Sequence, residues 1–148
     1  MSAGSVTASG PGSECSAQVM VSDDEIAFPY IRRSDIFVAL SQSAYEKFVG
    51  EMKEGAMLVH EGDLVTPDAR LPKGVRTFGI PATCIADEEF RRRIVFNMIM
   101  IGFIAGATKV VGLDAVRRAV EDSVPQGTEA LNLKAFDRGY QYAVENYG

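Results

Sequence analysis

The sequence predicts a three-layer α/β domain with a mostly parallel, Rossmann-like sheet and helices on both faces. Two observations support this fold class. Strand-like apolar runs occupy the first half of the 148 residues, and helical patterns occupy the second half. Residues 35–40 and 56–60 are also continuous apolar runs. Such runs are typical of strands that are buried on both faces of a parallel sheet.

The first 25 or so residues are the least regular part of the chain. Residues 1–15 are mostly Ser, Gly, Ala and Thr, so we expect a flexible lead-in before a single domain that spans 16–148. Alternation of apolar and polar residues over 17–21 predicts a strand with one buried face. Residues 26–30 are expected to be short and extended, with Pro29 confining them to an edge or a loop.

A strand–helix–strand unit follows. The strand at 35–40 leads into a helix whose start is marked by Ser43 and Glu46, which have capping-box spacing. The helix is expected to end at Gly55, a residue that can adopt a left-handed conformation. The strand at 56–60 comes directly after it, and such short connections favour a parallel pair joined by a crossover helix.

Helical patterns dominate the rest of the chain, after a loop and one more strand. We expect a loop over 61–74, a strand over 75–80, and helices over about 83–89, 94–107, 113–122 and 133–147.

The helix at 94–107 contains Gly102 and Gly106, which have the spacing of a membrane dimer motif. The apolar run is shorter than the ~20 residues that a membrane span needs. We therefore interpret it as a tightly packed, buried helix of a soluble protein with no membrane partner.

The charge balance argues against nucleic acid as a partner. Lys plus Arg number 15 and Asp plus Glu number 20, so the net charge is −5, whereas phosphate binding requires a basic face. Arginine runs occur at 32–33, 91–93 and 117–118. They are separated and diluted by acids, so we interpret them as solvated faces or subunit contacts.

The two cysteines exclude an iron–sulfur cluster held by this chain alone. Cys15 and Cys84 are far apart, and no Cys-x-x-Cys occurs, so four thiolates are not available. The start of the chain has no basic segment followed by an apolar one, so we expect no signal peptide and a cytoplasmic protein without a structural disulfide.

No familiar catalytic constellation is present. The dinucleotide fingerprint and the Gly-x-Ser-x-Gly elbow are both absent, so we predict no catalytic residue and no metal site. His60, beside Glu61 and Asp63, could form a metal or base site, but a strand-end residue bonding to the loop is favoured. Cys84 could be a reactive thiol near a helix start, but a small buried hydrophobe is favoured.

Four polar residues are candidate contacts. Ser41 and Gln42 follow a buried strand and precede a helix, a position suited to an anionic or carbonyl group, so we predict that they bind a cofactor. Asn97 interrupts an apolar stretch. It either bonds a neighbouring loop or reaches a subunit interface or ligand. Asn132 is predicted to be an interface or polar contact as well.

Several short sequence motifs resemble those of one protein family in their order and spacing. From about residue 16 to 148 the chain resembles the gamma subunit, or gamma domain, of the 2-oxoacid:ferredoxin oxidoreductases. The 2-oxoglutarate type is favoured over the pyruvate type, because 39–45 is similar to the form in enzymes for 2-oxoglutarate or related 2-oxoacids. The motifs that carry the resemblance are residues 19–26, 39–45, 51–56, 80–83, 97–102, 123–125 and 132–140.

The resemblance implies a non-catalytic subunit of a larger enzyme. The family's complexes convert a 2-oxoacid and coenzyme A to acyl-coenzyme A and CO2, with electrons passed to ferredoxin, or run the reverse reaction. Thiamine diphosphate and iron–sulfur clusters lie in other subunits or domains, so this chain is expected to hold no cofactor of its own and only to help frame the approach of coenzyme A, with Ser41 and Gln42 as its candidate contacts. Its implied partners are the alpha, beta and ferredoxin-like delta subunits, and ferredoxin through the complex.

The chain also departs from the family pattern at its start. Family members begin with a strand–turn–helix that contains Gly-Gly-Gln-Gly, followed by a second glycine-rich stretch with an arginine, and neither occurs here. We therefore expect a sheet without its N-terminal strand–helix unit. The result would be an exposed strand edge or apolar face that a partner, or a second copy in a homodimer, covers.

Two functions of other classes stay open at this point. One is a stand-alone small-molecule-binding α/β module that uses the strand ends near Gln42 and His60. The other is a small hydrolase that uses Cys84 or His60.

Overall fold

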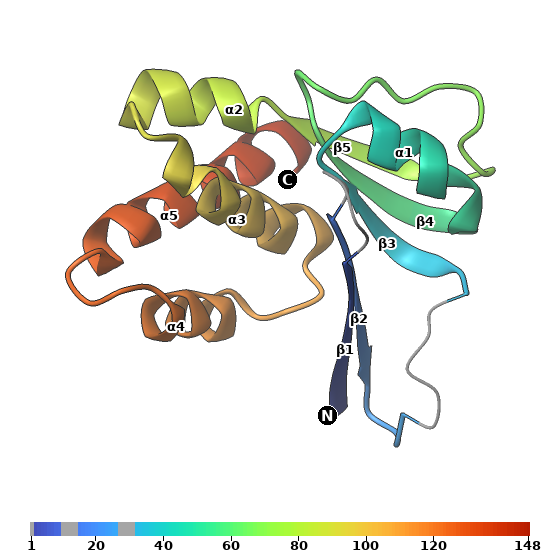
Figure 1. The fold of residues 1–148 in the computed structure, drawn as a ribbon, viewed down its shortest axis with the longest axis horizontal. Coiled ribbons are helices and arrows are strands. Elements are labelled where there is room, and N and C mark those ends of the chain that lie inside the picture. The colour runs from blue at the N-terminus through green and yellow to red at the C-terminus, as the bar shows by residue number, and fades with distance from the viewer. Residues whose placement is uncertain (1, 10–14, 27–31) are drawn as a thin grey trace.

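A parallel sheet of three strands lies at the centre of the fold (Figure 1). Its order is β3 (Ser34–Ala39), β4 (Met52–Glu61) and β5 (Arg76–Ile80), and both pairs are parallel. The structure is a computed structural model that describes residues 2–9, 15–26 and 32–148. The predicted parallel sheet is confirmed, with its strands close to the expected positions.

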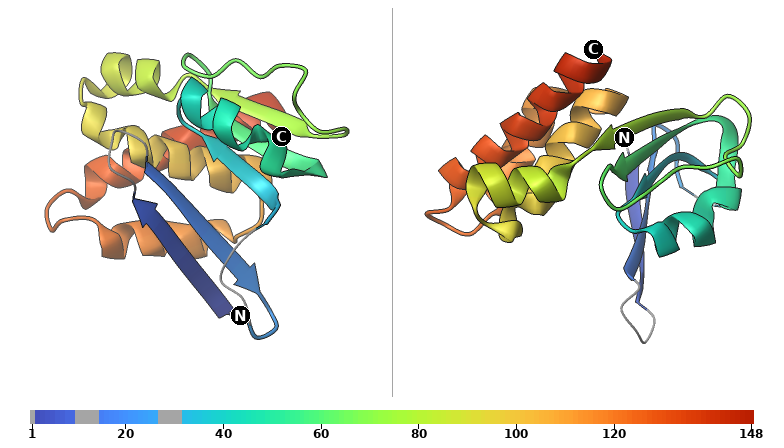
Figure 2. Two further views of the ribbon diagram at one scale, coloured as in Figure 1. Left: turned by 45° about the vertical axis from the view of Figure 1, so that its right-hand side comes forward. Right: turned by 90° about the horizontal axis from the view of Figure 1, so that it is seen from above.

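Helices cover both faces of this sheet, as the sequence predicts. On one face lie α1 (Gln42–Phe48) and the 3-10 turn η1 (Val49–Glu51). On the other lie α3 (Phe96–Thr108) and α5 (Glu129–Tyr147), and the three layers are visible from above in Figure 2.

Neighbouring residues of β4 serve opposite faces of the sheet. Leu58 is buried in the cluster with Tyr45 and Val49 of the α1 layer, whereas Val59 is buried in the cluster of the α3 and α5 layer. This alternation explains why the strand is a continuous apolar run. The central strand therefore has a core on each side.

The connection from β4 to β5 contains no helix, although the two strands are parallel. Parallel strands are usually joined by a crossover helix. Here residues 62–75 form a loop whose buried Val65, together with partly buried Leu71 and Val75, packs on the α1 side of the sheet. The loop takes the place that a second helix would have in that layer.

A run of short helical turns joins β5 to α3. These are α2 (Ala82–Ile85), the π-helical η2 (Ala86–Phe90) and the 3-10 turn η3 (Arg93–Val95). After α3, α4 (Leu113–Ser123) packs against α5 through Val120, Phe136 and neighbouring apolar side chains. The helical second half of the sequence is thus confirmed.

Helices α3 and α5 cross at very close range. A Cβ atom added at Gly102 would lie 1.9 Å from the carbonyl oxygen of Phe136, and one at Gly106 would lie 2.7 Å from Cβ of Ala143. The interpretation of these glycines as a packing device inside the protein is therefore confirmed. Among the described residues, no helix combines the length and apolarity that crossing a membrane requires.

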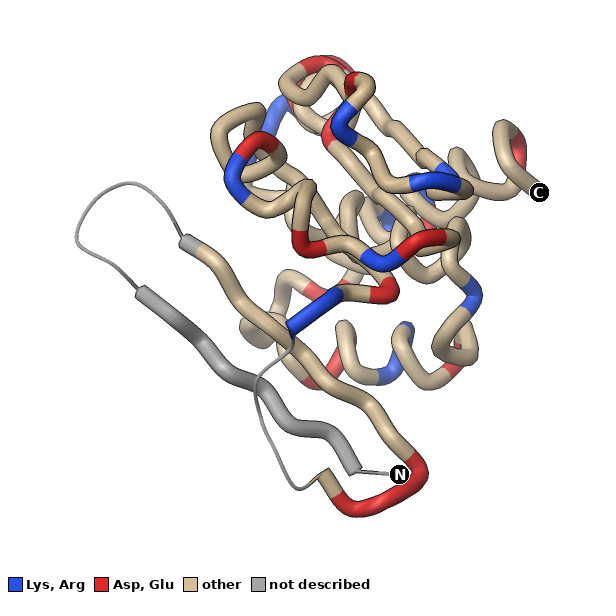
Figure 3. Tube along the Cα trace, turned by 90° about the vertical axis from the view of Figure 1, so that its right-hand side faces the viewer, with Lys and Arg blue, Asp and Glu red and all other residues tan. Residues whose placement is uncertain are grey.

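An antiparallel hairpin stands beside the three-stranded sheet and is not part of it. Strand β1 (Ser2–Ser9) pairs with β2 (Cys15–Ser22). Figure 1 shows the two strands running away from the body, and Figure 3 shows the same course for β2. The structure differs here from the expected lead-in over residues 1–15, because 2–9 form a strand. Of the stretch 26–30, residues 27–30 lie outside the described residues.

The apolar face of β2 is exposed. Val19 and Val21 are 61% and 53% exposed, and Ala17 is exposed with them. The prediction that this face is buried within the chain is therefore wrong. The alternation of the strand is correct, and the expected uncovered apolar face lies here.

The start and end of α1 differ from the prediction. The N-cap is Ser41, whose Oγ accepts the Ala44 N–H at 3.2 Å, and Ser43 lies inside the first turn. The helix ends at Phe48, before the expected Gly55. Gly55 does have a left-handed φ of 72°, at an irregularity of β4 where its N–H donates to the carbonyl of Lys73.

Candidate functional site at the carboxyl edge of the sheet

The carboxyl ends of β3, β4 and β5 meet at one edge of the sheet, where α/β folds commonly place ligands. Three segments follow these strands: 40–42, 62–66 and 81–83. The edge therefore brings together Ser41, Gln42, Glu61 and the first turn of α2.

Glu61 is the best-satisfied buried polar side chain of this edge. Its side chain is completely buried. One carboxylate oxygen accepts the N–H groups of Asp63 and Leu64, both at 2.8 Å, and the other accepts the Thr83 N–H at 3.0 Å. A buried carboxylate needs such donors, because burying it unpaired is very costly. Glu61 thus joins the loop after β4 to the start of α2.

Gln42 joins the loop after β4 to the helix after β3. Its Oε1 accepts the Thr66 N–H at 2.9 Å, and its Nε2 donates to Oε1 of Glu46 at 3.3 Å. Ser41 caps α1 as described above, and its hydroxyl lies 3.2 Å from that of Ser43. The two residues predicted to bind a cofactor therefore have well-defined partners within the chain.

A third connection joins α1 to a later residue of the same loop, Asp68. The hydroxyl of buried Tyr45 accepts the Asp68 N–H at 3.0 Å and donates to Oδ1 of Asp68 at 3.1 Å. Arg70 holds the same carboxylate with Nε and Nη2. The guanidinium of Arg70 lowers the pKa of Asp68 to about 2. Burial raises the pKa of Tyr45.

His60 lies against the backbone of the neighbouring strand. A Cβ atom at Gly79 would be 2.7 Å from Cε1 of His60, so this glycine makes room for the imidazole ring. The Nδ1 atom lies 3.3 Å from the carbonyl oxygen of Glu61. Glu61 is the last residue of β4, so this contact lies within the strand end, and the expected bond from His60 to the loop stays a prediction.

Cys84 is exposed, so its predicted role as a small buried hydrophobe is wrong. The buried positions of this turn belong to Ala82, Ile85 and Ala86, and Cys84 falls between them. Partial desolvation and the nearby carboxylate of Glu88 raise the pKa of the thiol. That direction is opposite to the lowered pKa of a thiol activated at a helix start.

The two asparagines lie far from this edge in the sequence. Asn97 is exposed in the first turn of α3, and within the described part of the chain no hydrogen bond of its side chain is found. Asn132 donates from Nδ2 to the carbonyl oxygen of Thr128 at 2.9 Å, inside its own helix. Its predicted interface role stays a prediction.

The carboxyl edge presents a surface whose polar side chains hold loops together. Leu40 and Leu64, in the segments that follow β3 and β4, are exposed. Over 16–26 and 32–148, where side chains are described, no three His, Cys, Asp or Glu residues are grouped closely enough to hold a metal ion.

Sequence reasoning missed the roles of Glu61 and Tyr45. In the sequence Glu61 stands out only as a neighbour of His60. In the structure its carboxylate accepts three backbone hydrogen bonds that join two segments of the edge. A usable signal was present, since Glu61 ends a strand whose preceding run is largely apolar, and a carboxylate that is buried at such a position needs hydrogen-bond donors.

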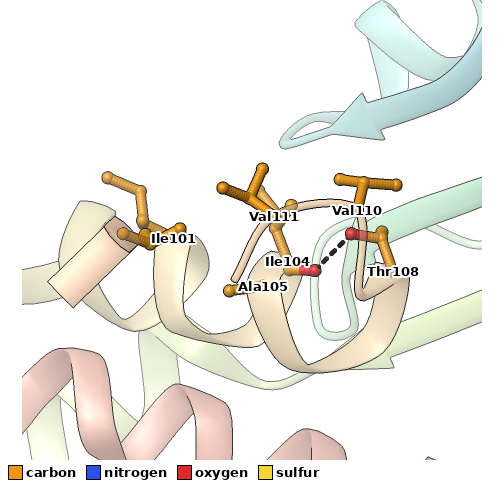
Figure 4. A pocket seen from close by; sticks show the side chains of 7 residues that line it. Ile101, Ile104, Ala105, Thr108, Val110 and Val111 are labelled. Carbon is orange, nitrogen blue, oxygen red and sulfur yellow. Dashed lines mark hydrogen bonds between the residues drawn. The ribbon is translucent and has the colours of Figure 1, made fainter. Parts of the chain in front are cut away.

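An apolar groove of about 200 Å³ lies along α3, where the loop after α3 and the start of α4 meet it (Figure 4). Ile101 and Ile104 of α3, Val110 and Val111 of the following loop, and Val116 of α4 line it. The hydroxyl of Thr108, the polar side chain among its lining, donates to the carbonyl oxygen of Ile104 at 2.7 Å. The groove thus offers an apolar surface only.

Comparison with known proteins gives a consistent relationship. The family model described as pyruvate ferredoxin/flavodoxin oxidoreductase matches residues 5–142. The 2-oxoglutarate synthase subunit KorC of Methanocaldococcus jannaschii is 40% identical, and the match covers 90% of this chain and 72% of that protein. Subunit KorC of Methanothermobacter thermautotrophicus is 38% identical, with 90% and 73% covered.

A solved structure shares the fold. The gamma subunit of keto/oxoacid ferredoxin oxidoreductase from Geobacter sulfurreducens PCA superimposes with a TM-score of 0.81 at 30% identity. The superposition covers 97% of this chain and 80% of that one. The resemblance found in the sequence is confirmed by the family model, by the relatives and by the fold. The chain belongs to the pyruvate ferredoxin/flavodoxin oxidoreductase family.

Proposed function

We propose that the chain is the gamma-type subunit of a 2-oxoacid:ferredoxin oxidoreductase, of the type that acts on 2-oxoglutarate. The observation that carries this proposal is the match to two 2-oxoglutarate synthase subunits over about nine tenths of the chain. The fold of a gamma subunit supports it. As in the family's complexes, the reaction forms acyl-coenzyme A and CO2 from a 2-oxoacid and coenzyme A, with reduction of ferredoxin.

The carboxyl edge supports a framing role over a catalytic one. The side-chain oxygens of Ser41, Gln42 and Glu61 each accept hydrogen bonds from backbone amides of the edge, in helix starts or in the loop after β4. These bonds hold the edge in one shape, as a surface that borders another subunit's site requires. Within this proposal, thiamine diphosphate and the iron–sulfur clusters belong to alpha, beta and ferredoxin-like delta subunits, and the complex lies in the cytoplasm.

The predicted contacts of the chain remain part of the proposal. Ser41 and Gln42 would meet coenzyme A at the carboxyl edge, and Asn97 and Asn132 would meet a companion subunit. Residues 16–148 would act as one domain, and the exposed face of β2 would be covered by a companion or a second copy. Asn97 is the best placed of the four, because its side chain is exposed and, among the described residues, has no hydrogen bond, whereas the side chains of the other three have partners within the chain.

Reconstitution tests the proposal. The chain is co-expressed with candidate alpha, beta and delta subunits, and the purified complex is assayed for coenzyme-A-dependent reduction of ferredoxin by 2-oxoglutarate, pyruvate and a branched 2-oxoacid. We expect a complex with highest kcat/KM for 2-oxoglutarate and no turnover by this chain alone. Turnover by the purified chain, or failure to join any such complex, would overturn the proposal. Thermal stabilisation of the lone chain by coenzyme A would favour the stand-alone binding module.

A further inference from the structure

The turn between η2 and η3, residues 91–94, projects basic and apolar side chains into solvent. Arg91 and Arg92 are exposed, and within the described residues neither guanidinium has an ion pair or hydrogen bond. Ile94 is 81% exposed, the highest value among the large hydrophobic side chains of the described residues. Figures 1 and 2 place η2, which continues α2, on the side of the molecule away from the three-stranded sheet.

Two of the three acidic residues beside this tip are engaged by other arginines. Asp87 pairs with Arg93 through Nε and Nη2 at 3.1 and 3.2 Å. Glu89 pairs with Arg138 of α5, with Nε of the arginine 2.8 Å from Oε2, and Glu88 forms no ion pair with Arg91 or Arg92 among the described residues. The neighbouring carboxylates therefore do not neutralise Arg91 and Arg92, although the whole chain has a net charge of −5.

The tip is held in place on both sides. Phe90 packs against the main core on one side, and Val95 is completely buried on the other. The N–H groups of both Arg91 and Arg92 donate to the carbonyl oxygen of Ala86. A short turn anchored in this way has little backbone entropy left to lose on binding.

Arg91 has an unusual backbone conformation for its residue type. Its φ is 52°, in the left-handed region that glycine or asparagine adopts at lower cost. The π-helical turn before it is also a feature that occurs often at functional sites. Lys109, the C-cap of α3, has the same conformation with a φ of 54°, so the conformation fixes the direction of the turn at Arg91 and the docking argument rests on the exposed side chains.

We propose that the tip 91–94 docks on an acidic patch of a companion subunit, with Ile94 entering an apolar hollow between the acids. This inference rests on the proposed function. Arg91 and Arg92 have no ion pair among the described residues, and Ile94 beside them is exposed. The surface that complements them on a companion subunit has an apolar centre surrounded by acidic side chains. An anionic membrane fits less well, because two arginines and one isoleucine on a net acidic protein give only weak surface binding.

Binding of the chain to the companion subunits, measured by biolayer interferometry from 50 to 300 mM salt, tests the inference. We expect R91E/R92E to weaken binding at least tenfold at low salt, mainly through slower association, and to flatten the salt dependence. Ile94→Ser should weaken binding severalfold without changing that dependence. The double variant K73E/R118E is the matched control, because both residues are exposed, make the same charge change and lie on the 62–75 loop and α4.

The outcomes separate the two proposals. If the wild-type chain binds no companion, the proposed function falls and the docking surface with it. If the wild type binds and R91E/R92E binds equally well, or if K73E/R118E weakens binding as much, the docking surface is wrong while the function stands. Vesicles with 30% phosphatidylserine form the second arm. Wild-type binding to them that R91E/R92E abolishes, with subunit binding intact, would assign the tip to a membrane.

Discussion

Gly102 of α3 and Gly139 of α5 make room for each other's helix in the same way. A Cβ atom at Gly102 would lie 1.9 Å from the carbonyl oxygen of Phe136, and one at Gly139 would lie 1.9 Å from that of Ile99. Each glycine therefore faces the carbonyl three residues before the other glycine. The two helix backbones touch at a pair of matched positions, so the crossing tolerates no side chain there.

Substituting either glycine by alanine should be severely destabilising. Because backbone atoms cannot move aside as a side-chain tip can, we expect Gly102→Ala or Gly139→Ala to cost at least about 3 kcal/mol of unfolding free energy. Urea denaturation followed by circular dichroism measures this. Gly50→Ala is the control, since a Cβ there meets nothing within 4 Å, and should change stability by less than about 0.5 kcal/mol. Equal effects at both sites would contradict the close crossing.

Removal of the Glu61 carboxylate should loosen the carboxyl edge. Glu61→Ala leaves three N–H groups without their acceptor, and we expect a loss of about 3 kcal/mol. Glu61→Gln keeps one acceptor oxygen and should cost less. Hydrogen exchange should become faster at Asp63, Leu64 and Thr83. The exposed Glu54→Ala is the control, and unchanged exchange at all three amides would argue against this role.

Tyr147 protects the outer edge of β5. Its hydroxyl accepts the Gly79 N–H and donates to the Gly79 carbonyl, both at 3.0 Å. Tyr147→Phe keeps the ring contact with Phe78 but removes both hydrogen bonds, so we expect a loss of about 1 kcal/mol. Amide exchange of Gly79 should accelerate while that of Val59, in the central strand, stays unchanged. A protected Gly79 amide in the variant would show that the hydroxyl does not cover this edge.

Asp68 should titrate at unusually low pH. Its pKa is lowered from 3.8 to about 2, chiefly by hydrogen bonds from Arg70. A carboxyl whose pKa falls on folding adds stability above its unfolded pKa, and this contribution is lost as pH falls from about 4 to about 2. An NMR titration of the side-chain carbon should give a midpoint near 2. In Arg70→Gln the midpoint should rise toward 3.8, and an unshifted midpoint would exclude Arg70 as the cause.

Cys84 should react slowly for an exposed thiol. Because its pKa is raised, with the carboxylate of Glu88 as one cause, less thiolate is present at pH 8 than in an ordinary cysteine. Alkylation by iodoacetamide, followed by peptide mass spectrometry, should be slower than for a model peptide. Glu88→Gln should accelerate it, and Glu121→Gln, on α4, should not. Alkylation faster than the peptide would indicate an activated thiol.

The central sheet could be predicted because its signal is local and strong. The apolar runs at 35–40 and 56–60 appear as β3 and β4 with shifts of a few residues. Leu58 and Val59 show why the runs are continuous, since each serves a different core. The helix predicted over 94–107 appears as α3, because its long apolar run is likewise a strong local signal.

Other features depended on information that the local pattern does not contain. Alternation along β2 shows that its two faces differ, but not which face is covered, and Val19 and Val21 proved to be exposed. Ser41 and Ser43 are equally good caps by residue type, and the end of β3 at Ala39 decides between them. The partners of Glu61 lie on two segments, one of them 22 residues away, so the sequence alone could not pair them.

The long connection between β4 and β5 is tied down largely through its own main chain. The side chains of Glu61 and Gln42 accept hydrogen bonds from the backbone amides of Asp63, Leu64 and Thr66. Any residue except proline supplies such an amide. Most outward side chains of this segment are therefore free to change without loss of attachment. Relatives that act on different 2-oxoacids could remodel the chemistry of this surface by substitution while its path stays the same.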